Sequence, residues 1–186
     1  MIFTLGLVTV NAQKTFKADV SATEIKWNGK KIGREHTGTI ALKEGWLTFN
    51  GKLITAGEFI VDMTTIRDLD LKDDAMREKL ETHLKSDDFF GVAKYPLSKI
   101  IINSSSINAD GTLAVKGHIT IKEATHPVEF IAKATKSGDL TIWSALITID
   151  RSLYDVRYGS GKFFSNLGDS AISDDFTVDV KLAVKR

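Results

Sequence analysis

The side chains of this 186-residue chain that are best suited to metal chemistry are its four histidines. They stand far apart, and no two have the spacing that places metal ligands on one helix face or one strand. The chain has no cysteine, which excludes thiolate metal sites, a cysteine nucleophile and disulfides. The sequence therefore predicts no local metal motif, although the fold could still assemble a site from distant residues. The histidines are His36, His83, His118 and His126.

Two Asp-Arg pairs follow a long apolar stretch and allow two interpretations. Asp150 and Arg151 stand at its end, with Asp155 and Arg157 just downstream. In the first interpretation these groups form ion pairs that hold the following loop, because charges near apolar surface are normally paired. In the second, an arginine binds a phosphate or carboxylate head group through two parallel hydrogen bonds, assisted by His36 from the neighbouring rim.

Motifs for covalent or phosphate chemistry are missing from the sequence. There is no Gly-x-Ser-x-Gly nucleophile elbow. The glycine-rich segment 158–162 lacks the spacing of a phosphate-binding loop. A net charge of +1, from 25 basic and 24 acidic residues, disfavours nucleic acid as the main partner. We therefore expect no catalytic residue, no cofactor and no nucleic-acid partner.

The elements that must position these groups are mainly β-strands, because apolar and polar residues alternate through most of the chain. Turn residues separate the runs, at Asn28-Gly29, Lys43–Gly45 and Asn50-Gly51 among others. Eight or nine strands joined by short hairpins predict an all-β protein with an antiparallel barrel, since closure removes unpaired edges. The segments with a strand-like pattern cover residues 15–20, 25–27, 37–42, 46–49, 53–63, 97–107, 113–121, 127–136, 140–149 and 176–184.

A short helical insertion is predicted near residues 72–86, with Asp73 or Asp74 as its cap and its end at Ser86. Phe89 and Phe90 follow it and no longer fit its apolar face. They are either ordinary core residues or part of a lid that closes one end of the barrel. The apolar face of the helix would consist of Met76, Leu80, His83 and Leu84.

The first residues predict export. Residues 2–10 form a short apolar run, and residues 10–12 resemble a small-residue cleavage site. We interpret residues 1–12 as the remnant of a secretory signal, which predicts a periplasmic or secreted protein; an N-terminal strand is the alternative. The run is too short to span a bilayer. Residues 13–186 would then form a single barrel domain.

Several stretches together resemble the YceI-like family of extended lipocalin-type proteins, over about residues 18–185. One departure is residues 122–127, because the family commonly has Lys-Gly before the threonine where this chain has Lys122-Glu123. The stretches that carry the resemblance are 33–40, 57–63, 83–90 with Tyr95-Pro96, 149–151, 158–160 and 163–169.

The resemblance implies a lipocalin-like barrel of about eight strands, with an apolar channel that binds polyisoprenoids or similar amphiphilic lipids. It also implies that the helix and the phenylalanine pair lie at one end of the barrel, that the protein is exported, and that some members form dimers. Alternation alone cannot tell a hollow barrel from a filled one, so the expected cavity rests on the resemblance.

The hypothesis is a non-enzymatic protein that binds and carries or sequesters a polyisoprenoid or isoprenoid quinone. Two alternatives remain: a barrel enzyme that uses Asp150, Arg151 or His36 as acid or base on an amphiphile, and a solid-cored interaction protein that acts as a homodimer. The expected ligand-binding residues are Trp27, His36, Phe59, Val61, Met63, Leu84, Phe89, Phe90, Ile119, Ile121, Phe130, Trp143, Leu146 and Arg151.

Overall fold

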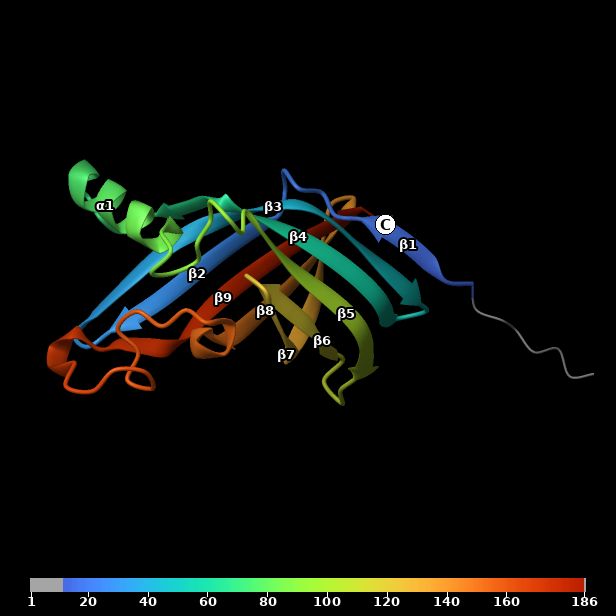
Figure 1. Ribbon diagram of the computed structural model, residues 1–186. Helices are drawn as coiled ribbons and strands as arrows, with labels where there is room; N and C mark the ends of the chain where they lie inside the picture. The colour runs from blue at the N-terminus through green and yellow to red at the C-terminus, as the bar shows by residue number, and fades with distance from the viewer. Residues whose placement is uncertain (1–11, 186) are drawn as a thin grey trace, which may run out of the picture.

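Alternating apolar and polar side chains produce strands that each turn one face inward, and nine such strands form one antiparallel sheet (Figure 1). The structure is a computed structural model that describes residues 12–185. The predicted signal remnant lies almost wholly outside these residues. The strands are β1 (Lys14–Lys17), β2 (Glu24–Lys31), β3 (Arg34–Asn50), β4 (Leu53–Asp68), β5 (Leu97–Ile107), β6 (Leu113–Ile121), β7 (Ala124–Ser137), β8 (Leu140–Asp150) and β9 (Ile172–Lys185).

The sheet closes because β3 pairs with β4 along one edge and with β2 along the other. The closed order is β3-β2-β9-β8-β7-β6-β5-β4, which confirms the predicted barrel of about eight strands. The ninth strand, β1, pairs with Trp46–Phe49 of β3, beyond the segment that β2 occupies. Ala18 then bridges to Val184 of β9. The two short strands β1 and β2 therefore fill one position of the barrel in succession.

Two predicted turns are wrong. Asn28 and Gly29 lie inside β2, where they pair with β3 on one side and β9 on the other. The chain reverses instead at Ile32-Gly33, where Gly33 adopts a φ of 70°. Pairing on both edges has overridden the local turn preference of Asn-Gly.

Residues Lys43–Gly45 are also continuous strand within β3, which bends through register shifts rather than turning back. Gly45 is required by a close approach: a Cβ there would lie 2.2 Å from Cδ1 of Phe59 on β4. The glycine that suggested a turn thus makes room for an aromatic ring of the neighbouring strand.

Other predictions agree closely with the structure. The chain reverses after Asn50 through Gly51, which has a φ of 60°. β5 and β6 have the bounds that alternation predicted. The unusual Lys122-Glu123 pair forms a two-residue turn in which Lys122 takes the left-handed conformation, with a φ of 53°. The hairpin between β6 and β7 is therefore intact despite the departure from the family pattern.

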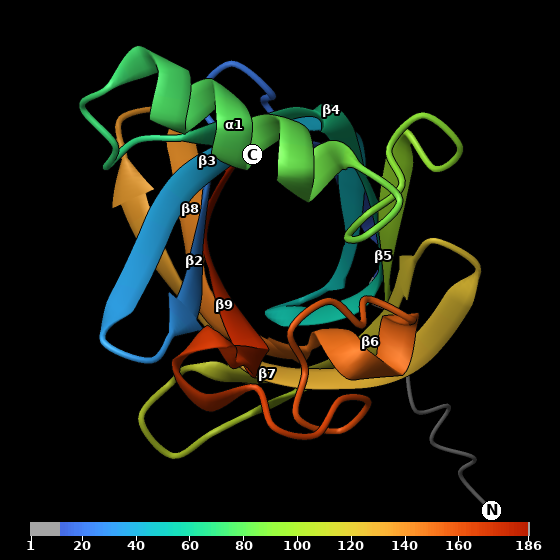
Figure 2. The same ribbon diagram turned by 60° about the vertical axis from the view of Figure 1, so that its left-hand side comes forward.

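The predicted helix is α1 (Asp74–Lys85), and Asp73 caps it by accepting a hydrogen bond from the backbone N–H of Met76 at 2.8 Å. It ends at Ser86 as expected. Met76 points to solvent and is 55% exposed, so only the later part of the predicted apolar face packs on the barrel. Figure 2 shows α1 lying along the rim at one end of the barrel. No helix in residues 12–185 has the length and apolar character needed to cross a membrane.

Candidate ligand-binding channel

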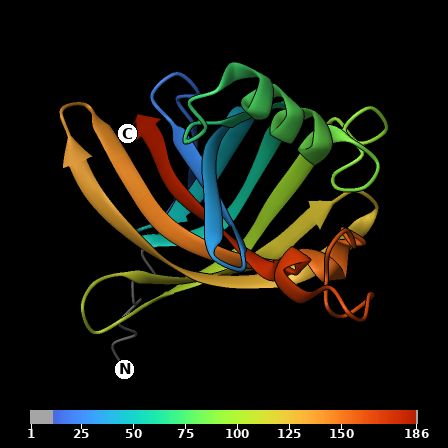
Figure 3. The ribbon, with the colours of Figure 1, turned by 90° about the vertical axis from the view of Figure 1, so that its left-hand side faces the viewer.

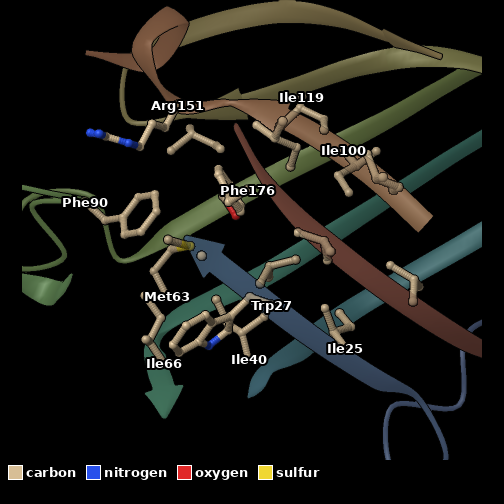
Figure 4. A pocket seen from close by; sticks show the side chains of 18 of the residues that line it. Ile25, Trp27, Ile40, Met63, Ile66, Phe90, Ile100, Ile119, Arg151 and Phe176 are labelled. Carbon is tan, nitrogen blue, oxygen red and sulfur yellow. The ribbon is translucent and has the colours of Figure 1, made fainter. Parts of the chain in front are cut away.

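The barrel encloses a cavity of about 480 Å³. Inward-facing side chains from each strand of the closed barrel line it, and nearly all are aliphatic or aromatic. Figure 4 shows Arg151 and Phe90 on one side of the cavity, with aliphatic side chains continuing away from them towards Ile25. This volume falls within the usual range for small-molecule sites, about 300–1,000 Å³. The barrel is therefore hollow, which alternation alone left open.

Every predicted ligand-binding residue except Leu146 lines this cavity. Leu146 is 63% exposed on the outer face of β8, whereas its neighbour Ile147 is 4% exposed and faces inward. The prediction for Leu146 is wrong because Trp143, which does face inward, is three residues away, and an odd separation in a strand places two side chains on opposite faces. The predicted residues that line the cavity are Trp27, His36, Phe59, Val61, Met63, Leu84, Phe89, Phe90, Ile119, Ile121, Phe130, Trp143 and Arg151.

Sequence reasoning missed other lining residues that strict alternation from the predicted ones would have found. Ile25 lies two residues from Trp27 on β2, and Ile147 lies four residues from Trp143 on β8. Other missed residues, among them Ile40, Ile100, Phe176 and Val178, lie on strands that the sequence also assigned, whereas Ile66 lies in the part of β4 beyond the predicted end at residue 63.

The charged groups of the cavity wall cluster at one end. There α1, the β2–β3 turn and the segment 151–171 come together around the opening (Figures 1 and 3). Lys30, Lys31, Arg34 and His36 contribute from the β2–β3 hairpin, and Tyr158 contributes from the segment 151–171. We call this end the mouth. It combines cationic and hydrogen-bonding groups with an apolar interior.

Aromatic rings connect the two sides of the mouth. Phe89 is buried, and its ring centroid lies 5.0 Å from that of His83 and 5.5 Å from that of Tyr158. His83 and Tyr158 meet edge to face at 4.5 Å. Phe90 points into the cavity and contacts Phe176 of β9, with 6.2 Å between ring centroids. The phenylalanine pair thus contributes to the buried packing and also lies at the mouth.

Arg151 is buried and holds the segment that follows it. Its Nε donates to the carbonyl of Ser173 at 2.8 Å, Nη1 to that of Val156 at 2.7 Å and Nη2 to that of Ile172 at 3.0 Å. Asp174 lies 3.6 Å from Nη2. Burial lowers the pKa of the Arg151 guanidinium, while Asp174 and Asp150 oppose this shift. These bonds favour the structural interpretation, in which the arginine fixes the loop.

The charged side chains next to Arg151 also form hydrogen bonds or ion pairs. Asp150 accepts hydrogen bonds from Nζ of Lys162 at 2.6 Å and from the backbone N–H of Ser152 at 2.9 Å. Arg157 pairs with Asp155 at the surface. Neither Asp150 nor Arg157 lines the cavity. The ion pairs expected around the loop are therefore present.

One polar cluster escaped the sequence analysis. Nδ1 of His36 lies 3.0 Å from Oδ2 of Asp70 and 3.8 Å from Oδ2 of Asp68. Burial raises the pKa of Asp68, and the adjacent Asp70 carboxyl acts in the same direction. No spacing rule could have found this group, because pairing between β3 and β4 brings together residues more than thirty positions apart.

A YceI-like domain model matches residues 16–184, almost the whole described barrel. The chain belongs to the YceI-like family. It is 32% identical over 103 residues to protein YceI of Escherichia coli O157:H7, which covers 55% of this chain and 50% of that protein. The chain spans about half the length of the curated relatives it matches.

Solved structures of low sequence identity share the fold of this YceI-like chain. BcnA of Burkholderia cenocepacia superimposes with a TM-score of 0.66 at 16% identity, covering 89% of this chain and 98% of BcnA. A polyisoprenoid-binding domain from Saccharophagus degradans gives 0.66 at 12% identity, covering 91% and 97%. These similarities confirm the lipocalin-like barrel predicted from the sequence.

Proposed function

We propose that this YceI-like protein binds a long-chain amphiphilic lipid, a polyisoprenoid or isoprenoid quinone, with its tail inside the barrel. The observation that carries the proposal is the apolar cavity of about 480 Å³ whose charged groups gather at the mouth. An amphiphile matches this arrangement, with its chain in the apolar interior and its polar end near Lys30, Arg34 and His36. The structural neighbour described as a polyisoprenoid-binding domain supports the same class of ligand.

Burial of the tail provides the binding energy. Each methylene group removed from water contributes about 0.8 kcal/mol, before the cost of ordering a flexible chain is subtracted. Affinity should therefore rise with chain length until the tail fills the cavity and then level off. The tail would contact the predicted lining residues, which lie on strands from β2, with Trp27, to β8, with Trp143.

We further propose that the protein carries or sequesters this lipid without transforming it. Of the residues considered as acid or base, Arg151 donates to three backbone carbonyls and Asp150 is engaged by Lys162 and Ser152 away from the cavity. The solid-cored alternative does not fit the cavity. We also propose that the protein is exported to the periplasm or out of the cell, which cell fractionation would test. Assembly as a homodimer is a further proposal, which sedimentation would test.

The decisive experiment is native mass spectrometry of the protein purified together with membrane lipids, followed by organic extraction of the bound molecule. We expect one isoprenoid-type lipid per barrel. A ligand-free mass that stays unchanged after incubation with farnesol, geranylgeraniol and a longer polyprenol would contradict the proposal. For the non-enzymatic part, the extracted lipid should be recovered unaltered after prolonged incubation with the protein.

A further inference from the structure

Three potential metal ligands converge at the seam between β3 and β4. Nδ1 of His36 and one carboxylate oxygen from each of Asp68 and Asp70 all lie within 4.8 Å of one another. The separations from Nδ1 are 3.0 Å and 3.8 Å. Two ligands held at about 2.1 Å from a tetrahedral zinc ion stand about 3.4 Å apart, so these separations bracket the value a metal requires.

Backbone N–H groups orient both carboxylates. Oδ1 of Asp68 accepts from the backbone N–H of Leu71 at 2.8 Å, and Oδ1 of Asp70 accepts from that of Thr37 at 2.7 Å. Each residue thereby turns its other oxygen, Oδ2, towards the imidazole. Such outer bonds hold ligating carboxylates in place in metal sites and set their direction before the ion binds.

The buried member of the cluster has one carboxylate oxygen without a hydrogen-bond partner. Asp68 is 2% exposed, and its Oδ2 has no hydrogen-bond partner. Within residues 12–185, the only basic side chain within 4.0 Å of either carboxylate is that of His36. Two carboxylates beside one imidazole leave an excess of negative charge at a partly buried point, which an added cation would compensate.

We propose that His36, Asp68 and Asp70 bind a divalent first-row transition metal, with Zn²⁺ as its probe. One imidazole nitrogen and two carboxylate oxygens suit such an ion, whereas Ca²⁺ requires six to eight oxygen ligands and Mg²⁺ a near-octahedral set. Coordination through Nδ1 places the imidazole proton on Nε2. Three protein ligands leave at least one position for water.

A metal at this point would tie the segment that leads into α1 to the barrel. Asp70 lies in the connection between β4 and α1, and Asp68 is the last residue of β4. Oε1 of Glu81 on α1 accepts from the backbone N–H of Asp68 at 3.0 Å. His36 stands across the seam on β3 and lines the mouth. The ion would therefore join β3 to the segment that leads into α1.

The test is a Zn²⁺ titration of the full protein after removal of metals with EDTA, followed by calorimetry and by metal analysis after dialysis. We expect one zinc ion per chain, a melting temperature that rises with zinc concentration, and no comparable effect of Mg²⁺ or Ca²⁺. Asp70→Asn should weaken zinc binding at least tenfold, since it replaces a ligand oxygen by an amide. His36→Gln should do the same.

Asp110→Asn is the matched control, because Asp110 also accepts a backbone N–H bond, from Thr112 at 3.0 Å, but lies in the β5–β6 turn. It should bind zinc like the parent protein. Absence of stoichiometric zinc in the parent would overturn the proposal. Equal affinity in Asp70→Asn and the parent would show adventitious binding only, and would also overturn it. Neither outcome depends on lipid binding.

Discussion

The imidazole of His83 on α1 and the phenol ring of Tyr158 in the segment 151–171 meet edge to face, with 4.5 Å between their centroids. This contact joins the two sides of the mouth above the buried Phe89. Both residues line the cavity at its mouth, where the proposed lipid would enter or leave. The pair is therefore well placed to set the rate of exchange.

Tyr158→Ala should accelerate lipid release, because it removes the ring that contacts α1. An aromatic pair contributes about 0.5–1.5 kcal/mol, which corresponds to an increase of about two- to thirteenfold in the release rate. Stopped-flow transfer of a fluorescent polyprenol to acceptor vesicles measures this rate. Tyr158→Phe keeps the ring and should behave like the parent; an identical rate in Tyr158→Ala would show that the contact does not limit exchange.

Arg151→Lys should destabilise the protein by about 3 kcal/mol, because lysine cannot donate to the three backbone carbonyls that the guanidinium reaches. Chemical denaturation measures the loss, and limited proteolysis should show earlier cleavage within residues 151–171. The exposed Arg157 provides the control, and Arg157→Lys should change stability by less than about 0.5 kcal/mol. Similar losses in both variants would contradict the structural role of Arg151.

Gly38→Ala should displace Trp27 and disturb the channel. A Cβ at this position would lie 2.3 Å from Cζ2 of the Trp27 indole and 1.9 Å from the carbonyl oxygen of Arg67. Overpacking of this kind costs about 1–3 kcal/mol, and tryptophan fluorescence should report the moved indole. Gly29→Ala is the control in the adjacent strand, where a Cβ meets nothing within 4 Å. Unchanged fluorescence and stability in Gly38→Ala would contradict this packing.

Two neighbours on β8 test which face of that strand binds lipid. Ile147→Asn places a polar side chain in the cavity wall, so lipid affinity should fall at least about tenfold and stability by about 1–3 kcal/mol. Leu146→Asn changes the outer face of β8. It should leave the free energy of lipid binding and the free energy of unfolding within about 0.5 kcal/mol of the parent values. Fluorescence titration and thermal melts separate the two effects. Equal loss of affinity in both variants would contradict binding inside the barrel.

Acid should weaken the contact between Asp150 and Lys162. Burial raises the pKa of the Asp150 carboxyl, but hydrogen bonds from Lys162 and Ser152 outweigh it and hold the pKa below the ordinary value of 3.8. A carboxyl with a lowered folded-state pKa contributes stability above pH 3.8 and loses that contribution as the pH falls further.

Asp150→Asn should therefore cost up to about 1 kcal/mol at pH 7, and the difference from the parent should shrink below pH 3.8. Denaturation midpoints of the variant and the parent, measured from pH 7 to below pH 3.8, give this difference in stability. Lys162→Gln should show a similar loss at pH 7. A difference that persists unchanged in acid would exclude the ionised carboxyl as the cause.

Local patterns were enough to predict the helix and several of the strands. Alternation is a property of neighbouring residues, so it placed β5 and β6 with their observed bounds and put Phe59, Val61 and Met63 on one inner face. The cap at Asp73 is equally local. The lipocalin-like fold followed from these elements together with the family resemblance.

The tertiary structure alone decided the features that depend on how the strands pair. β8 is apolar on both faces, and only its place in the closed barrel turns Leu146 outward and Ile147 inward. Pairing on both edges keeps Asn28-Gly29 in a strand. Closure through β3 and β4 assembles His36 with Asp68 and Asp70, because the partners of a seam are far apart in the sequence and no local spacing records their register.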